Sequence, residues 1–130
     1  MFKEYEDTAT VTAQNYYNSD DADNFYFTIW GGEDIHIGLY YSDQDTIDEA
    51  SRRTVKRMAE LAEIKAGSRV LDLGAGYGGA ARYLAAEYGC NTAALNLSEK
   101  ENQRDREKNR EQGFEDRIEV IDATYEDVPY

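Results

Sequence analysis

The chain has 130 residues, of which 27 are acidic and 14 are basic, so its formal net charge is -13. This length suits one domain with a single hydrophobic core. An acidic surface repels nucleic acid and anionic membranes, so neither is an expected partner. Strong acidity with few lysines is typical of proteins that stay soluble in concentrated salt, and equally of an ordinary acidic cytoplasmic protein.

Cysteine and histidine each occur once. The lone Cys90 excludes an internal disulfide, and we expect it to be buried filler. The N-terminal segment MFKEYEDTAT has no apolar signal region, and no stretch approaches the length of a membrane helix, so a reducing cytoplasm fits best. The lone His36 excludes a histidine-based zinc cluster, and no metal site is predicted.

The first third of the chain is rich in tyrosine and aspartate. Residues 8–17 predict a short helix with Thr8 as its N-cap. A second helix begins near Asp20 and ends at the pair Gly31-Gly32, after which residues 33–41 read as loop or extended chain. Residues 46–64 form the clearest amphipathic helix.

Strands and helices alternate after Gly67. The predicted order is strand 69–73, helix 80–88, strand 91–96, helix 99–112 and strand 117–121. Ser98 is the predicted N-cap of the second of these helices, with Glu101 as its capping-box partner and Gly113 as its C-cap. Such alternation predicts an α/β fold with parallel strands and right-handed crossovers. The apolar run that opens the first strand predicts that this strand is buried.

The segment 70–79, VLDLGAGYGG, carries the strongest functional signal. It reads as the end of a strand, a glycine turn and the start of a helix. Glycines let ligand atoms approach the backbone, and the free N–H groups of a helix start point at the ligand. Gly74, Gly76 and Gly79 also fit the G-x-G-x-x-G spacing of dinucleotide sites. The glycines alone therefore do not identify which nucleotide binds.

Asp72 distinguishes a dinucleotide from S-adenosylmethionine as the expected ligand. It lies two residues before the first glycine, where a dinucleotide would bring its pyrophosphate. Like charges about 5 Å apart repel by roughly 3 kcal/mol at an effective dielectric of about 20. S-adenosylmethionine instead carries an ammonium, a sulfonium and one carboxylate, so Asp72, with the turn Gly74-Ala75-Gly76, favours that ligand. The alternative is that Asp72 only orders the turn by accepting from backbone N–H groups.

The other two strands also end in polar residues, and ligands of such sheets lie beyond the carboxyl ends of the strands. At the second strand, Asn96-Leu97 is the predicted ribose contact, with Glu101 as a possible source of a carboxylate. The alternative makes Asn96 a helix-entry residue and Glu101 only a cap. At the third strand, the Asp122 carboxylate can accept from the adenine amino group while the Ala123 N–H reaches a ring nitrogen, although an aspartate after a strand is common at surfaces.

With these residues in place, residues 68–130 resemble class I S-adenosylmethionine-dependent methyltransferases. The stretch NSDDADNFYFTIWGGEDIHIGLY and the later AALNLSEKEN narrow the resemblance to sarcosine/dimethylglycine N-methyltransferases. The resemblance implies a Rossmann-like fold and methylation of an amine by in-line displacement, toward the osmolyte glycine betaine in salt-stressed hosts. Most ribose sites have an acid at the end of the second strand, and Asn96 at that position agrees with this subgroup.

The resemblance further implies how the chain is divided. Residues 1–43 would be an aromatic lid, and residues 44–130 the cofactor-binding half of a seven-stranded domain of which three strands are present. Tyr17 and the segment His36-Ile37-Gly38 would lie near the methionine end of the cofactor, and Glu101 near the ribose. The edge of the first strand would be exposed, which predicts self-association.

Several alternatives stay open. Core packing is the expected role of most of the eleven tyrosines, and Trp30 is either lid or core. His36 is a general base or a structural residue, and no catalytic residue is assigned. The chain could instead be a fragment of an NAD-dependent oxidoreductase, or a non-catalytic nucleoside-binding module.

Overall fold

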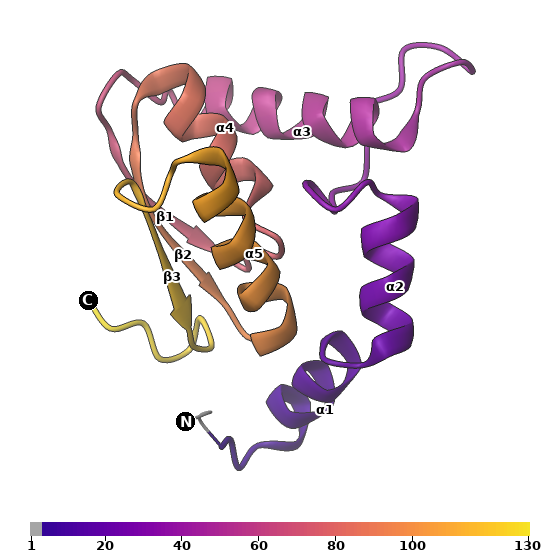
Figure 1. Cartoon of the computed structure of the whole chain (residues 1–130), viewed down its shortest axis with the longest axis vertical. Coiled ribbons are helices and arrows are strands. Elements are labelled where there is room, and N and C mark those ends of the chain that lie inside the picture. Colours follow the sequence, from indigo (N-terminus) through magenta and orange to yellow (C-terminus); the bar gives the residue numbers. More distant parts are fainter. Residues whose placement is uncertain (1–3) are drawn as a thin grey trace.

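The computed structural model describes residues 4–130, so the first three residues of the predicted lid lie outside the described residues. Five helices and three strands follow one another along this part of the chain (Figure 1). They are α1 (Thr8–Tyr17), α2 (Asp20–Ile29), α3 (Ile47–Leu61), β1 (Arg69–Leu73), α4 (Gly79–Tyr88), β2 (Asn91–Asn96), α5 (Glu99–Gln112) and β3 (Ile118–Asp122). The alternation predicted after Gly67 is confirmed.

The three strands form one parallel sheet in the order β1-β2-β3. Helices α4 and α5 are the two crossovers, and both lie over one face of the sheet (Figure 1). Ala81 and Ala85 of α4 pack there against Ala94 of β2 and Ile118 of β3. The predicted α/β class is therefore confirmed, and all three strands end at the same edge of the sheet.

The prediction that the first strand is buried is wrong. Leu71 and Leu73 are 40% and 50% exposed. Side chains of a strand alternate between the two faces of a sheet, and these two leucines point away from the face that α4 and α5 cover. Among the described residues, β1 also has a neighbouring strand on one side only, because β2 lies between it and β3. The buried strand is β2, whose Ala94 and Leu95 are almost fully enclosed.

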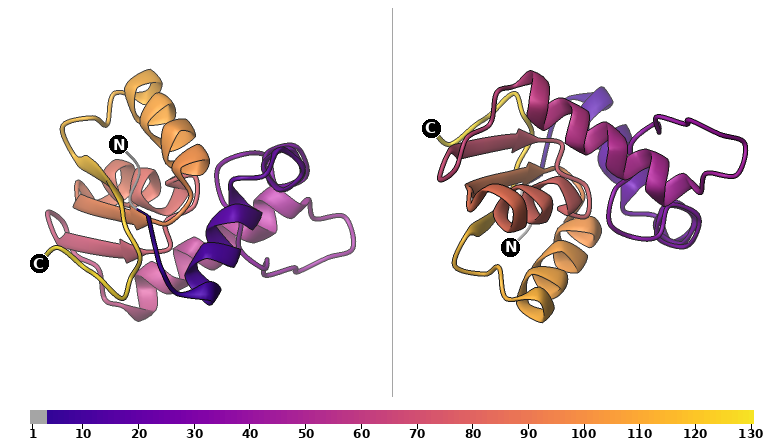
Figure 2. Two further views of the ribbon diagram at one scale, coloured as in Figure 1. Left: turned by 90° about the horizontal axis from the view of Figure 1, so that it is seen from below. Right: turned by 90° about the horizontal axis from the view of Figure 1, so that it is seen from above.

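The N-terminal helices stand beside the carboxyl ends of the strands (Figures 1 and 2). Polar contacts fasten them to α5. The Asn18 side chain accepts from the Ser98 hydroxyl at 2.8 Å, and Asp23 pairs with Arg104 at 2.7 Å. Residues distant in sequence thus hold α1 and α2 over the edge of the sheet where the strands end.

Core packing is not the role of most tyrosines. Within residues 4–130 only Tyr77 is fully buried, where it donates to Asp23 at 3.0 Å. Several tyrosines of α1, of the loop before α3 and of the C-terminal segment are exposed. They lie on segments that stand beside the sheet rather than on it. Cys90 is fully buried, as predicted.

Some helix ends differ from the predictions. Asp7, not Thr8, caps α1, because its carboxylate accepts from the Thr10 N–H. Ser98 caps α5 as predicted, but Glu101 does not complete a capping box; its carboxylate turns instead to Asn96. Among residues 4–130, no helix has both the length and the apolar character to cross a bilayer. That part of the chain also holds no group of three potential metal ligands.

Candidate cofactor site

A cavity of about 500 Å³ opens where the strands end. Its walls come from α1, from the loop after α2, from the glycine turn after β1, and from the ends of β2 and β3. This is the position that ligands of doubly wound sheets occupy. The predicted site residues that line it are Tyr17, His36, Gly74, Ala75, Gly76, Asn96, Leu97, Glu101 and Ala123.

Ile37 and Gly38 are not brought to the cavity lining. The Ile37 side chain is 91% exposed, and its carbonyl accepts from the Thr54 hydroxyl at 2.7 Å. Gly38 is pressed against α3, where a Cβ atom would lie 2.4 Å from Cβ of Ala50. The chain therefore leaves the cavity after His36 and packs on α3.

Asn96 and Glu101 form a buried pair at the end of β2. The Asn96 amide donates to the Glu101 carboxylate at 2.8 Å, and the glutamate is 3% exposed. Burial raises the pKa of Glu101 to about 7, against the bond from Asn96, which lowers it. The cavity thus presents an amide and a carboxyl group side by side, a combination that can accept and donate to the two hydroxyls of a ribose.

The residues at the end of β3 are already engaged within the protein. Asp122 accepts from Asn102 at 2.8 Å and pairs with Arg106 at 2.5 Å, so its carboxylate faces α5 and is absent from the cavity lining. Ala123 lines the cavity, and its N–H donates to the Asn96 carbonyl at 3.3 Å, a long bond. The predicted adenine contacts stay predictions.

Asp72 is not among the residues that line the cavity. Burial raises the pKa of its carboxyl, while the nearby His36 lowers it. The His36 backbone is fixed on both sides, since its N–H donates to Ser51 at 3.0 Å and its carbonyl accepts from the Trp30 indole at 3.1 Å. The structure therefore brings the single histidine within electrostatic reach of Asp72.

The glycines of the turn serve different purposes. A Cβ atom at Gly74 would meet nothing within 4 Å, whereas one at Gly76 would lie 3.1 Å from Ile35. At Gly78 the corresponding space is filled by the Asp105 carboxylate, and at Gly79 by the Asp34 carboxylate together with the backbone carbonyl of Glu33. The space for a Cβ atom is thus open at Gly74 alone, although Gly76 and Gly79 also line the cavity.

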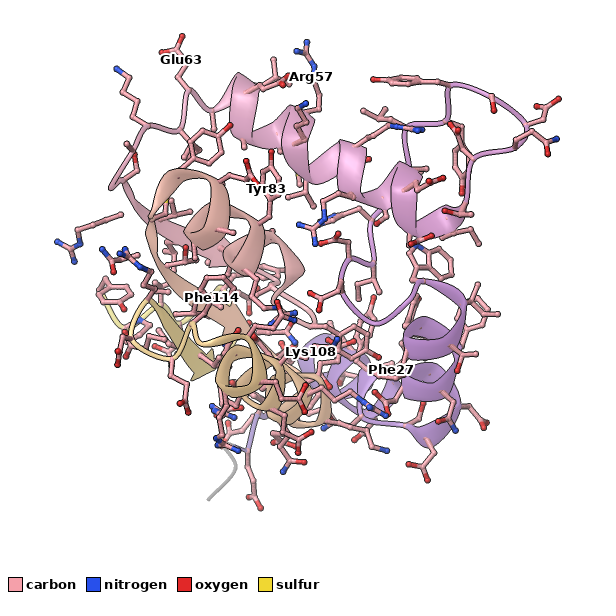
Figure 3. The ribbon with its side chains drawn as sticks, turned by 45° about the horizontal axis from the view of Figure 1, so that its top comes forward. Phe27, Arg57, Glu63, Tyr83, Lys108 and Phe114 are labelled. Atoms are coloured by element: carbon pink, nitrogen blue, oxygen red, sulfur yellow. The ribbon has the colours of Figure 1, made fainter. Side chains whose placement is uncertain are left out.

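An ion-pair network joins α4, α5 and the loop after α2. Arg82 of α4 is almost fully buried and pairs with Glu33 and Asp105, each at 2.8 Å. Lys108 of α5 pairs with the same Glu33 at 3.0 Å and points toward Phe27 of α2 (Figure 3). This network holds one wall of the cavity against the two crossover helices.

The charge of the cavity lining is the feature that sequence reasoning missed. Asp7, Glu33, Asp34 and Glu126 line the cavity together with Glu101, and among the described lining residues none is lysine or arginine. Burial raises the pKa of Asp34, although Arg52 pairs with it at 2.9 Å. Consecutive acids in the segment GGEDIHIG were the available signal. Because Glu33 and Asp34 are paired with arginine or lysine side chains from outside the lining, the excess negative charge comes from Asp7, Glu101 and Glu126. Such a lining attracts a cationic ligand and repels an anionic one.

The chain matches the family described as mycolic acid cyclopropane synthetase over residues 5–130. It is 63% identical over 131 aligned positions, covering 100% of this chain and 47% of the relative, to a sarcosine/dimethylglycine N-methyltransferase of Halorhodospira halochloris. The resemblance stated from the sequence motifs is therefore confirmed.

Solved structures agree with this family. A crystal structure of a candidate sarcosine dimethylglycine methyltransferase from Galdieria sulphuraria superposes with a TM-score of 0.79 at 46% identity, covering 88% of this chain and 44% of that one. Coclaurine N-methyltransferase with bound S-adenosylhomocysteine shares the fold at 23% identity, with a TM-score of 0.70 over 88% of this chain and 34% of that one. These likenesses confirm the predicted Rossmann-like fold. The chain spans less than half the length of these relatives.

Proposed function

Because the chain belongs to the mycolic acid cyclopropane synthetase family, we propose that its cavity holds S-adenosylmethionine for N-methylation of sarcosine and dimethylglycine. The observation that carries the proposal is a cavity rich in carboxylates whose described lining residues include neither lysine nor arginine. A dinucleotide would bring two phosphates to this lining. S-adenosylmethionine brings a sulfonium and an ammonium, so its net charge suits the lining.

The residues present fit this cofactor. Asn96 and Glu101 would hold the ribose hydroxyls, and Ala123 would lie at the adenine, with Asp122 behind it. Asp72, His36 and the open face of Gly74 would surround the methionine end, and Tyr17 of α1 would cover it. When bound, the cofactor supplies a methyl group made electrophilic by its positively charged sulfur.

The work of the protein is mainly positioning and exclusion of water. Thr10, Ala13 and Tyr17 place one side of α1 along the cavity. The face of Tyr17 can stabilise a methyl-bearing cation by about 0.5–2 kcal/mol through cation–π attraction. The clamped backbone of His36 keeps the neighbouring wall in place. These features support transfer to an amine, which needs little acid–base assistance once the amine is neutral.

Calorimetric titration with S-adenosylhomocysteine tests the proposal. The unchanged protein should bind it, and Asp72→Asn should bind at least about tenfold more weakly, because a carboxylate near the ammonium is lost. Asp21→Asn, an exposed change on α2, is the matched control and should leave the affinity unaltered. Binding of NAD by the unchanged protein, together with no binding of S-adenosylhomocysteine, would reject the proposal.

We further propose that the chain self-associates through β1. Its outer edge has no neighbouring strand within residues 4–130, and the exposed Leu71 and Leu73 lie beside it. Light scattering should show dimers or larger species whose share grows with concentration. A compact monomer at every concentration would contradict this.

The composition bears on the environment of the protein. We propose a cytoplasm rich in salt, which the charge of -13 and the scarcity of lysine support.

A further inference from the structure

Two carboxylates fill the space beside the first residues of α4. A Cβ atom at Gly78 would lie 2.0 Å from Oδ1 of Asp105, and one at Gly79 would lie 2.2 Å from Oδ1 of Asp34. Asp105 comes from α5 and Asp34 from the loop after α2. They are 0% and 5% exposed. Both glycines therefore admit the carboxylates of the protein itself to the helix start.

Arginines hold these carboxylates by one oxygen each. Oδ1 of Asp105 accepts from Arg82 at 2.8 Å, and Oδ2 of Asp34 pairs with Nε of Arg52 at 2.9 Å. The remaining oxygens, Oδ2 of Asp105 and Oδ1 of Asp34, are buried without a hydrogen-bond partner among the described residues. Buried acceptors without donors are costly. Both carboxylates lie at the start of α4, where the helix dipole favours negative charge.

The start of this helix is also the place where nucleotide phosphates bind in related sheets. Here Gly79 and Ala80 still line the cavity, but the space beside Gly78 and Gly79 is filled by protein atoms, and two carboxylates already lie at the helix start. Asp72, the carboxylate that the sequence motif singles out, lies within electrostatic reach of Asp105. Of the three, only Asp34 lines the cavity, and Asp72 and Asp105 would act on a phosphate group there through their charge.

We propose that Asp34 and Asp105 set the ligand class of the cavity by excluding phosphate-bearing adenosine compounds from the start of α4. The inference rests on the proposed function, because it takes the adenosine end to lie at Asn96 and Glu101. It adds two specificity-determining residues, neither of which belongs to the glycine motif. Asp34 acts by its position against Gly79, and Asp105 by its position against Gly78.

The test compares S-adenosylhomocysteine with ADP, which carries two phosphates in place of the amino-acid portion. Both are titrated by calorimetry into the unchanged protein and into Asp34→Asn, which keeps the side-chain volume and removes the charge. The affinity for ADP should rise about tenfold in the variant, while the affinity for S-adenosylhomocysteine should stay within about threefold. Thermal unfolding establishes that the variant is folded, and Asp105→Asn is the second variant, tested in the same way.

Glu33→Gln is the matched control. Glu33 is the adjacent residue, lines the same cavity and loses the same charge, but its carboxylate points to Arg82 and Lys108. An equal gain of ADP affinity in this control, or no gain in either aspartate variant, would overturn the inference while leaving the cofactor proposal intact. Failure of the unchanged protein to bind S-adenosylhomocysteine would instead contradict the proposed function.

Discussion

Replacing Gly78 with alanine should lower the free energy of unfolding by about 2–5 kcal/mol. Gly78 has φ of 78°, a left-handed conformation that costs an alanine about 1–2 kcal/mol. The new Cβ would also lie 2.0 Å from the Asp105 carboxylate. Overpacking costs about 1–3 kcal/mol, and here the carboxylate that must move is paired with the buried Arg82. The two penalties add, because Asp105 must shift against its pairing with Arg82 while the backbone stays left-handed.

Gly113→Ala separates the backbone cost from the cost of overlap. Gly113 has nearly the same φ, 76°, but a Cβ atom there would meet nothing within 4 Å. Only the left-handed penalty of about 1–2 kcal/mol should remain. Urea unfolding of both variants measures the difference. Equal losses would show that Asp105 can move aside, and that the packing of carboxylates on the glycine turn is not tight.

Glu101→Gln should stabilise the protein by about 3 kcal/mol at pH 8 and leave it unchanged at pH 4. The pKa of Glu101 is about 7 in the folded chain, against an ordinary value of 4.5. Folding therefore favours the protonated carboxyl. Its contribution to stability is complete below pH 4.5 and is lost as the pH rises through about 7. A glutamine keeps the acceptor for Asn96 and carries no charge to desolvate.

Thermal and urea unfolding across this pH range measure the effect. Glu126→Gln removes a carboxyl group from an exposed position on the same cavity, and it should change stability by less than about 0.5 kcal/mol. A glutamine variant of Glu101 that is no more stable at pH 8 than at pH 4, each relative to the unchanged protein, would contradict the raised pKa. If the variant also binds S-adenosylhomocysteine more weakly, the buried carboxylate is kept for the ligand at the expense of stability.

The pH dependence also bears on the role of the site. A carboxyl group can accept from ribose hydroxyls with both of its oxygens only when it is ionised, because in the protonated form one oxygen carries a proton and donates. Binding of the ligand should therefore favour release of a proton from Glu101. Asp105, whose pKa burial raises to about 6, titrates in the same range but lies behind the glycine turn. The variant Glu101→Gln distinguishes the two carboxyl groups, because it removes proton release by Glu101 and leaves Asp105 in place.

Local patterns determined most of the fold. The strands at residues 69–73 and 91–96 and the helix at residues 99–112 were predicted with the bounds that the structure has, because apolar runs, glycine turns and a serine cap act over a few residues. The glycine turn and the polar ends of the strands also located the cavity, since parallel strands that alternate with helices must end at one edge of the sheet.

Tertiary structure alone decided which side chains surround the glycine turn. Asp34 and Asp105 are far from Gly78 and Gly79 in sequence, and only the packing of α5 and of the loop after α2 brings them there. The exposure of β1 has the same origin, because two crossovers of one hand cover a single face. Sequence by itself thus determined the elements, the family and the edge of the sheet where a ligand binds. The charge and the occupied space at that edge follow from contacts between segments that are far apart in the sequence. No local sequence pattern predicts such contacts.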